Sequence, residues 1–330
     1  MNTFKALIAD KTDEGTEISI KDVNIEALTE GDVLIDVHYS SVNYKDGMVA
    51  AQGGIAEYFP IIPGIDLAGE VIESSDDRFN PGDKVIATSY KVGTGISGGF
   101  AETARIPADW IVPLPDGLTL KESMELGTAG LTAGISITKL EQAGITPDNG
   151  DILVTGASGG AGSLAISMLA DSGYTVVAST SSIDETDYLK SLGAAKVIHR
   201  SDVTNQDEKP TGKPLFQAAI DPVGGKTTEY IIKSLQPEGA LATFGLVGGI
   251  AVSTTVLPFI GRGIHWLGVD SVFYPMELRK KVWDRLAKDL KPKILDKDIV
   301  SEVSLDELPQ VLHDIIDGKV RGRTIVNLKK

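Results

Sequence analysis

The run from Ile152 to Ser163 holds the residues whose spacing points most directly to chemistry. An apolar segment enters a glycine turn in which Gly156, Gly159 and Gly162 are three residues apart, and an apolar helical pattern follows. Strand, glycine turn and helix in that order are what a dinucleotide site requires. Glycines let the backbone approach the pyrophosphate, and the free N–H groups and dipole of a helix start attract its charge. A glycine-rich turn also serves close packing, but a second strand-helix-strand unit follows here, which favours the nucleotide site.

The end of the next predicted strand bears on which dinucleotide binds. It reads Ser179-Thr180-Ser181-Ser182, and no acidic residue occurs before Asp184. An acid at this place would accept hydrogen bonds from the ribose 2′-OH of NAD and repel the 2′-phosphate of NADP. Hydroxyl groups can donate to a phosphate, with Lys190 or Arg200 as nearby cations. The pattern favours NADPH, although a plain polar turn with a helix cap is the other interpretation of the same hydroxyls.

The inventory of metal ligands is short. There is no cysteine, and the only histidines are His38, His199, His265 and His313, without an HExxH pair. A thiolate zinc site is therefore impossible. A site of His, Asp and Glu alone is conceivable, but His38 and His313 are expected to be structural or surface residues. We predict no metal, and hence conjugate addition of a hydride to an activated double bond, with the protein orienting the substrate and supplying a proton.

Composition limits the remaining choices. A chain of 330 residues with 42% hydrophobic and 23% charged residues predicts a globular protein of two domains. The net charge of -15 disfavours nucleic acid as a partner, and the densest internal basic cluster, Arg279 to Lys281, is expected to be a solvated helix face. Without a signal-peptide core, a membrane span or a cysteine, the expected location is the cytoplasm.

The elements that position these residues change character along the chain. Residues 4–117 read as short strands broken by turns, and residues 122–140 read as a helix. From Asp151 strands and helices alternate, which predicts a doubly wound parallel sheet of six strands. The strands are expected at 152–155, 175–179, 196–198, 217–220, 240–244 and 264–268, with helices at 160–173, 185–192 and 227–235. The tail, with helices at 275–290 and 305–317 and a strand at 323–328, is expected to return to the first domain.

Several short segments, in order, resemble the medium-chain dehydrogenase/reductase superfamily, in particular its zinc-free acrylyl-CoA reductase and quinone oxidoreductase group. They are Ser41-Val42-Asn43-Tyr44-Lys45-Asp46, Ile62-Pro63-Gly64-Ile65-Asp66-Leu67-Ala68-Gly69, Gly98-Gly99-Phe100-Ala101-Glu102, Gly127-Thr128-Ala129-Gly130-Leu131-Thr132-Ala133 and Gly268-Val269-Asp270-Ser271-Val272. The resemblance implies an α/β chain with a GroES-like, mainly β catalytic domain at 1–124, a Rossmann domain at 125–270 and a return segment at 271–330. Where zinc relatives carry Gly-His-Glu, this sequence has Gly64-Ile65-Asp66.

The resemblance also implies an activity and a set of contacts. The activity is NADPH-dependent reduction of a short enoyl thioester, acryloyl-CoA to propanoyl-CoA. Tyr44 is placed near the nicotinamide, and Asn43 beside it is the other candidate catalytic residue. The remaining implied NADPH contacts are Ser158, Gly159, Gly160, Ala161, Gly162, Thr180, Ser181, Ser182, Arg200, Leu246, Ile260 and Ser271. Some relatives show Ser-Gly-Arg where this chain has Ser181-Ser182, so a guanidinium group is missing from that turn.

Some roles stay open at this stage. Tyr44 can donate a proton, stack on the nicotinamide, or simply pack as an aromatic residue. For Asp46 a turn role is favoured, whereas Asp66 is either a buried carboxylate at a strand end or a turn residue. Lys45 and Arg262 can meet the phosphates of CoA or be ordinary surface cations.

Two other functions compete with enoyl reduction. One is reduction of a quinone or enone, and the other is a nucleotide-binding sensor or structural protein that keeps the fold without turnover. The apolar stretch 240–257, with Gly245, Gly248 and Gly249, resembles the edge at which relatives pair their sheets, so we expect a homodimer.

Overall fold

The computed structural model describes residues 3–13, 15–204, 209–295 and 300–330. The chain forms two compact units. The first contains residues 1–128, 272–287 and 295–330, and the second contains residues 129–271 and 288–294. The two units therefore divide between residues 128 and 129 and between residues 271 and 272, and residues 288–294 belong to the second unit.

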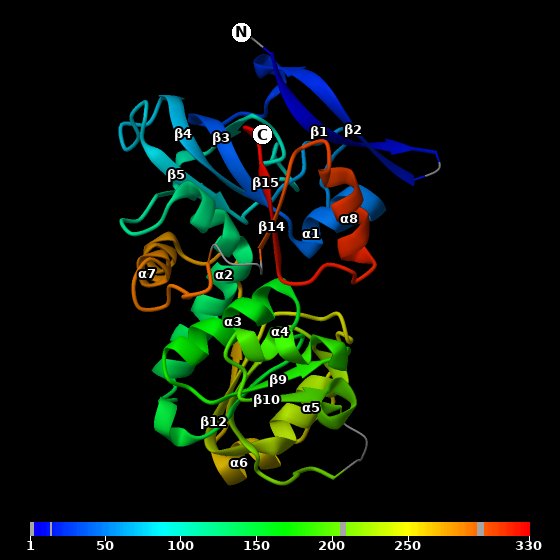
Figure 1. The fold of residues 1–330 in the computed structure, drawn as a ribbon, viewed down its shortest axis with the longest axis vertical. Coiled ribbons are helices and arrows are strands. Elements are labelled where there is room, and N and C mark those ends of the chain that lie inside the picture. Colours follow the sequence, from blue (N-terminus) through cyan, green and yellow to red (C-terminus); the bar gives the residue numbers. More distant parts are fainter. Residues whose placement is uncertain (1–2, 14, 205–208, 296–299) are drawn as a thin grey trace. The chain divides into compact units, whose positions relative to one another are not determined.

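The first unit is built around a mainly antiparallel seven-stranded sheet (Figure 1). Its strand order is β14-β15-β3-β4-β5-β7, and β6 also pairs with β3. The strands are β3 (Val33–Ser41), β4 (Asp66–Ser74), β5 (Lys84–Thr88), β6 (Thr103–Ile106), β7 (Ile111–Pro113), β14 (Val300–Val303) and β15 (Arg323–Asn327). The expected return of the tail is present, because β15 pairs antiparallel with β3. Residues far apart in the sequence thereby become neighbours in this sheet.

A long antiparallel hairpin precedes the sheet. Strands β1 (Thr3–Thr12) and β2 (Gly15–Asn24) pair along their whole length and extend to one side of the unit in Figure 1. Phe4, Ala6 and Ile8 of β1 belong to one small apolar cluster, and the intervening Leu7 and Ala9 are buried in two other clusters. Successive residues of a strand point to opposite faces, so both faces of residues 6–9 are covered.

The helices of the first unit are mostly short. Helix α8 packs on α1, where a Cβ on Gly47 would come within 2.9 Å of side-chain atoms of Ile315 and Ile316. The helical segments are η1 (Ile25–Ala27), α1 (Tyr44–Gly47), η2 (Met48–Gln52), η3 (Ala108–Trp110), α7 (Met276–Leu286) and α8 (Leu308–Ile316). Helix α2 (Leu120–Gln142) begins in the first unit and continues in the second.

The second unit is the predicted doubly wound sheet. Its six strands are parallel in the order β10-β9-β8-β11-β12-β13, with helices around them (Figure 1). The strands are β8 (Ile152–Val154), β9 (Val176–Thr180), β10 (Lys196–His199), β11 (Phe216–Asp221), β12 (Leu235–Thr243) and β13 (His265–Gly268). The helical segments are η4 (Pro147–Asn149), α3 (Gly160–Asp171), η5 (Ile183–Glu185), α4 (Thr186–Ser191), η6 (Arg200–Val203), α5 (Gly225–Ser234) and α6 (Leu257–Arg262).

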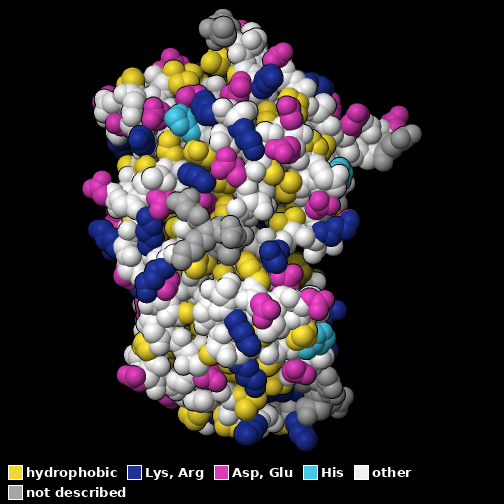
Figure 2. Space-filling model, viewed as in Figure 1, with side chains coloured by type: hydrophobic (Ala, Val, Ile, Leu, Met, Phe, Trp, Pro, Cys, Tyr) yellow, Lys and Arg dark blue, Asp and Glu magenta, His cyan; other side chains and the backbone are white. Residues whose placement is uncertain are grey.

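Burial follows the apolar pattern of the sequence. Strands β8 and β11 are buried at every residue, as expected for central strands of a sheet covered on both faces. On the face shown in Figure 2, acidic and basic side chains are interspersed. No helix among the described residues is long and apolar enough to cross a membrane.

Candidate active site

The glycine turn of the second unit has the geometry that its sequence predicts. Gly156 adopts a left-handed conformation with φ 53°, Gly159 is the N-cap of α3, and Gly162 lies against the carbonyl of Gly156, where a Cβ would clash. Residues Ser158 to Ala161 are partly exposed, so their backbone is accessible. No side chain caps the start of α3, which leaves its first N–H groups available to an anion.

A buried carboxylate stiffens the neighbouring loop. Asp221 ends β11 and accepts hydrogen bonds from Thr155 Oγ1 at 2.6 Å, from Thr228 Oγ1 at 2.5 Å and from the N–H of Val223 at 2.9 Å. Pro222 lies against Gly156, because a Cβ there would be 2.9 Å from its Cγ. Asp221 therefore ties the loop after β11 to the strand that carries the glycine turn, a link the sequence did not reveal.

The hydroxyl-rich turn and Arg200 meet at one edge of the sheet. In the parallel pairing of β9 with β10, His199 stands opposite Thr180. Ser181 and Arg200 therefore follow the ends of adjacent strands, and both are exposed. Lys190, the other cation considered for this place, is exposed on α4. Arg200 therefore follows the strand next to the one that ends in the Ser181–Ser182 turn.

In the first unit, Asn43 and Tyr44 come two and three residues after the end of β3. Tyr44 is the first residue of α1 and leaves 44% of its surface exposed. The Asn43 side chain is held at both ends, because its Nδ2 donates to Asp66 Oδ2 at 2.8 Å and its Oδ1 accepts from Arg323 Nη1 at 3.3 Å. The two candidate catalytic residues thus combine a fixed amide with an accessible ring.

Asp66, whose role the sequence left open, is a fully buried carboxylate at the start of β4. Its Oδ2 accepts from Ser41 Oγ at 2.7 Å, from Asn43 Nδ2 and from the N–H of Thr128 at 2.8 Å, while Oδ1 accepts from Thr128 Oγ1. These hydrogen-bond donors satisfy both oxygens of a carboxylate that is buried away from water. These contacts join the end of β3, the start of β4 and helix α2.

Gly127 makes this contact possible by breaking the regular backbone of α2. Its φ of 53° and ψ of -155° are outside the helical region. A Cβ at this position would lie 2.5 Å from Ser41 Oγ, 2.6 Å from Asp66 Oδ2 and 2.8 Å from Arg323 Nη2. Only glycine fits here, because both the backbone conformation and the surrounding polar atoms exclude a side chain.

Arg323 is the buried cation beside these carboxylates. Its guanidinium donates to the carbonyls of Glu125 and Val42 at 3.0 Å and to that of Met124 at 3.3 Å. Burial lowers the pKa of Arg323, whereas the negative charges of Asp66, Asp46 and Glu125 raise it. Sequence reasoning assigned Arg323 only to a terminal strand, because a single arginine there carries no local signal.

Asp46 has the turn role that the sequence favoured. Its Oδ2 accepts from the N–H of Asn43 at 2.7 Å and its Oδ1 from the N–H of Ile65 at 2.8 Å, so it joins the start of α1 to the segment before β4. Burial and, second, the charge of Asp66 raise the pKa of Asp46 to about 7. Its proton therefore titrates in the neutral range.

The other predicted residues lie in several places. Leu246 and Ile260 are 62% and 76% exposed, and Ser271 accepts a hydrogen bond from Thr132 Oγ1 at 2.8 Å. Leu246 borders a hollow of about 170 Å³ that Trp266 also lines. Arg262 is a structural residue, since its guanidinium donates to the carbonyls of Lys233, Leu235 and Gly212. Its predicted alternative role, contact with CoA phosphates, is not supported by this geometry.

The residues around Asp66 do not fit a zinc ion. Ile65 carries no ligating atom, and four donors already fill the lone pairs of Asp66. Over the described residues, no group of three or more His, Asp or Glu side chains can hold a metal ion.

The fold and these two sets of residues define a class: a dinucleotide-binding α/β unit joined to a mainly β unit, as in nucleotide-dependent dehydrogenases. Two family models match, one described as the alcohol dehydrogenase GroES-like domain over residues 29–116 and one as zinc-binding dehydrogenase over residues 160–288.

Individual proteins match nearly the whole chain. A Bacillus subtilis protein named "Putative quinone oxidoreductase YhfP" is 48% identical over 98% of this chain and 99% of its own. The crystal structure of Bacillus subtilis yhfP with NAD bound has a TM-score of 0.97, covering 99% of this chain and all of that one. The acrylyl-CoA reductase AcuI of Ruegeria pomeroyi is 40% identical over 98% of this chain and 99% of its own. The yhdH oxidoreductase of Salmonella enterica, crystallised with NADP, is 42% identical over 98% of this chain and all of that one, with a TM-score of 0.95.

The chain therefore belongs to the medium-chain dehydrogenase/reductase superfamily, in the group that contains YhfP and AcuI. The resemblance and the fold class read from the sequence are confirmed.

The raised pKa of Asp46 predicts how stability depends on pH. A carboxyl whose pKa is higher in the folded than in the unfolded state lowers stability as pH rises between the two values, here from about 4 to about 7. The side chain of the Asp46→Asn variant cannot ionise. The free energy of unfolding of this variant relative to wild type should therefore rise across this range, by up to about 1.4 kcal/mol per pH unit, and its Tm relative to wild type should rise with it. Thermal unfolding of both proteins from pH 5 to pH 8 at constant ionic strength measures the difference. A constant or falling difference would contradict a titration of Asp46 near pH 7 in the folded protein.

Proposed function

We propose that this protein catalyses NADPH-dependent reduction of an activated C=C bond, with acryloyl-CoA as substrate and propanoyl-CoA as product. The observation that carries the proposal is the hydrogen-bonded Asp66, which holds Asn43 next to the exposed Tyr44 and leaves no place for a metal ligand. The proposed acceptor is a double bond conjugated with a thioester, because the thioester itself activates the β-carbon toward hydride. The similarity to AcuI along the whole chain supports the same substrate.

In this proposal the second unit binds the cofactor. The backbone from Ser158 to Gly162 receives the pyrophosphate, and Thr180, Ser181, Ser182 and Arg200 receive the 2′-phosphate. Leu246, Ile260 and Ser271 are proposed as further contacts. The exposure of Leu246, Ile260 and Arg200 is compatible with these roles. The NADP-bound Salmonella enterica protein supports NADPH, and NAD in the Bacillus subtilis structure is a reason to measure both cofactors.

The first unit is proposed to position the reacting groups. NADPH held by the second unit would supply the hydride for the β-carbon of acryloyl-CoA, and water would supply the proton for the α-carbon, so that the products are propanoyl-CoA and NADP⁺. Tyr44 is proposed to cover the nicotinamide ring. Asn43 fixes the backbone before it, since its Nδ2 donates to Asp66 and to the carbonyl of Ser41 while its Oδ1 accepts from Arg323. A side chain fixed before the substrate arrives lowers the entropic cost of the reaction.

Reduction of a quinone or enone is the second candidate. The name of YhfP supports it, at the higher identity of 48%. A CoA thioester needs cationic anchors for its phosphates, whereas a small quinone does not. The acceptor thus separates the two candidates.

The test follows NADPH oxidation by purified protein with acryloyl-CoA and, separately, with a small quinone. We expect turnover of the thioester and a higher kcat/KM with NADPH than with NADH. Turnover of the quinone alone favours the second candidate, and NADPH binding without turnover of either favours a nucleotide-binding sensor.

The Arg200→Gln variant tests whether Arg200 binds the 2′-phosphate of NADPH, with NADH as the control cofactor. Loss of one charged hydrogen bond to the 2′-phosphate should raise the KM for NADPH about tenfold. The KM for NADH should stay unchanged, because NADH has no 2′-phosphate. An equal rise for both would assign Arg200 to a part shared by the two cofactors.

Tyr44 is expected to act through its ring. Its hydroxyl makes no hydrogen bond to any described residue, so nothing orients it for proton transfer. We predict that Tyr44→Phe keeps kcat within about threefold, while Tyr44→Ala lowers it on the order of tenfold or more through loss of ring positioning. Steady-state kinetics of the two variants decide the matter. Equal and large losses would instead assign the proton to the hydroxyl group, whose removal typically costs about a hundredfold or more.

We further propose a homodimer formed through β13. This strand is at one edge of the six-stranded sheet. Exposed apolar residues lie on it and on the segment before it, namely Val247, Ile250, Val256, Leu257 and Trp266. A sheet edge next to an apolar surface favours pairing with a second copy through a two-fold axis.

Sedimentation at micromolar concentration tests the dimer. Wild type should sediment at twice the chain mass of 34.9 kDa. Ile250→Glu places a charge on the most exposed of these apolar residues and should give a monomer, because burying an unpaired charge is costly. Ile72→Glu, at an exposed position on β4 of the first unit, is the control and should stay dimeric. A wild-type monomer would refute the proposal.

A further inference from the structure

Two consecutive residues after β5 have a backbone that only glycine adopts readily. Ser89 has φ 62° and Tyr90 has φ 49°, both in the left-handed region. Residues other than glycine are strained in this conformation. They keep it only where surrounding contacts hold them, often near functional sites. The contacts that hold this turn are therefore informative.

The main contact is a buried arginine from a distant part of the sequence. Arg279 on α7 is 1% exposed, and its guanidinium donates to Thr88 O, Thr88 Oγ1 and Val272 O, each at 3.0 Å. Its central carbon lies 4.5 Å from the centroid of the Tyr90 ring. A planar guanidinium can satisfy several carbonyls and lie over an aromatic face at once.

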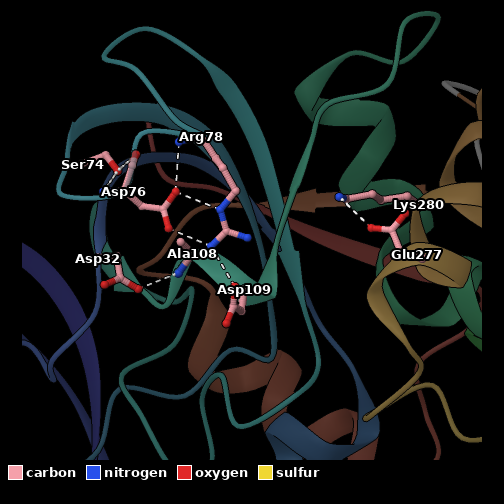
Figure 3. Close-up of polar contacts among 8 residues, drawn as sticks. All are labelled: Asp32, Ser74, Asp76, Arg78, Ala108, Asp109, Glu277 and Lys280. Carbon is pink, nitrogen blue, oxygen red and sulfur yellow. Dashed lines mark hydrogen bonds and ion pairs between the residues drawn. The ribbon is translucent and has the colours of Figure 1, made fainter.

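This corrects the sequence-based expectation for the basic cluster 279–281. The expected solvated face describes Lys280, which is paired with Glu277 at 3.3 Å (Figure 3). Arg279, one residue earlier, points into the unit instead. Neighbouring positions on a helix are about 100° apart, so adjacent charged residues can face solvent and core.

The ring of Tyr90 is held by aromatic neighbours as well. It stacks on Trp110 with a centroid distance of 5.3 Å and an interplanar angle of 4°, and Phe273 meets its edge at 6.2 Å. Trp110 belongs to η3, which Figure 3 shows to be braced on both sides. Asp32 accepts from the N–H of Ala108 at 2.9 Å, and Arg78 bridges Asp76 and Asp109 at 2.7 Å.

The Ser89–Tyr90 turn also contacts residues next to Asp66 and residues hydrogen-bonded to it. The N–H of Ser89 donates to the carbonyl of Ile65 at 2.8 Å, directly before Asp66. Ser89 Oγ is hydrogen-bonded to Thr128 Oγ1 at 2.9 Å, and Thr128 donates to Asp66 through both its N–H and its hydroxyl. A continuous set of contacts thus leads from Arg279 to the carboxylate that holds Asn43.

We propose that Arg279 is a positioning residue for the reaction: it fixes the left-handed Ser89–Tyr90 turn, and through Ser89 and Thr128 it fixes Asp66 and Asn43. The expected loss of kcat rests on the proposed function. The fixing of the turn and of Asp66 by Arg279 rests on the contacts alone. Arg279 does not itself touch the reacting atoms in this proposal. Its loss should therefore lower kcat by misplacing Asn43, with little change in the affinity for NADPH, which the second unit binds.

The experiment compares Arg279→Met with two controls on the same helix. Lys280→Ala removes an exposed cation, and Val282→Ala removes packing from a buried position without touching the guanidinium. For each variant, kcat and KM for the acceptor, the Kd for NADPH, the Tm and amide hydrogen exchange of peptides covering residues 85–100 and 124–132 are measured.

We expect Arg279→Met to lower kcat at least about tenfold, because a small misplacement of reacting groups has effects of this size. KM and Kd should stay within about threefold, and exchange should accelerate in both peptides, since the Ser89 and Thr128 N–H groups lose their fixed acceptors. Lys280→Ala should match wild type, and Val282→Ala should lower Tm while keeping kcat. If Arg279→Met does not fold, Arg279→Lys is used in its place. Lysine keeps a positive charge over Tyr90, so the expected loss of kcat is smaller.

The proposal is overturned if the folded Arg279 variant keeps kcat within twofold of wild type, or if Val282→Ala loses as much kcat at the same Tm. Absence of wild-type turnover with every acceptor would contradict the proposed function instead. In that case the exchange data decide: unchanged exchange over residues 124–132 overturns the role of Arg279, and faster exchange supports it.

Discussion

The carboxylate of Asp66 is the interaction on which the first unit depends. A charge buried without partners costs several kcal/mol, so its four donors must all be in place when the unit is folded. Those donors come from the end of β3 and from α2, and the cation Arg323 comes from β15. One buried charge thus obliges three distant parts of the chain to meet. This requirement explains the broken helix at Gly127, where any side chain would displace the donors.

The two units solve the problem of preorganisation in different ways. In the second unit, the proposed cofactor site consists of backbone groups, and glycines let such groups approach a phosphate closely. Asp221 holds that loop with hydroxyl and N–H donors, so a buried carboxylate again fixes a turn. In the first unit, the proposed site consists of the side chains of Asn43 and Tyr44, and other side chains orient Asn43. Asn43 shows this most clearly, because its amide oxygen and nitrogen have separate, opposite partners in Arg323 and Asp66.

Burying Asp46 and Asp66 close together is electrostatically unfavourable. Asp46 and Asp66 are two buried carboxylates near one guanidinium, and their mutual repulsion adds to the effect of burial on the pKa of Asp46. Asp46 nevertheless serves the fold through two backbone N–H groups, which tie α1 to the segment before β4. Placing Asn43 and Tyr44 between these two tied points gives a short segment whose backbone is fixed while its ring stays accessible. Such a combination suits a site that must bind and release small molecules.

The sequence by itself determined the local features: the alternating strands and helices of the second unit, the glycine turn from Gly156 to Gly162, and the family. These depend on residues near one another in the chain, where periodicity and turn chemistry are visible. Tertiary structure alone decided the partners of Asp66 and the burial of Arg279 in a cluster that reads as a surface. The physical reason is that a buried charge is satisfied by groups from distant segments, and spacing along the chain does not record which segments the folded sheets bring together.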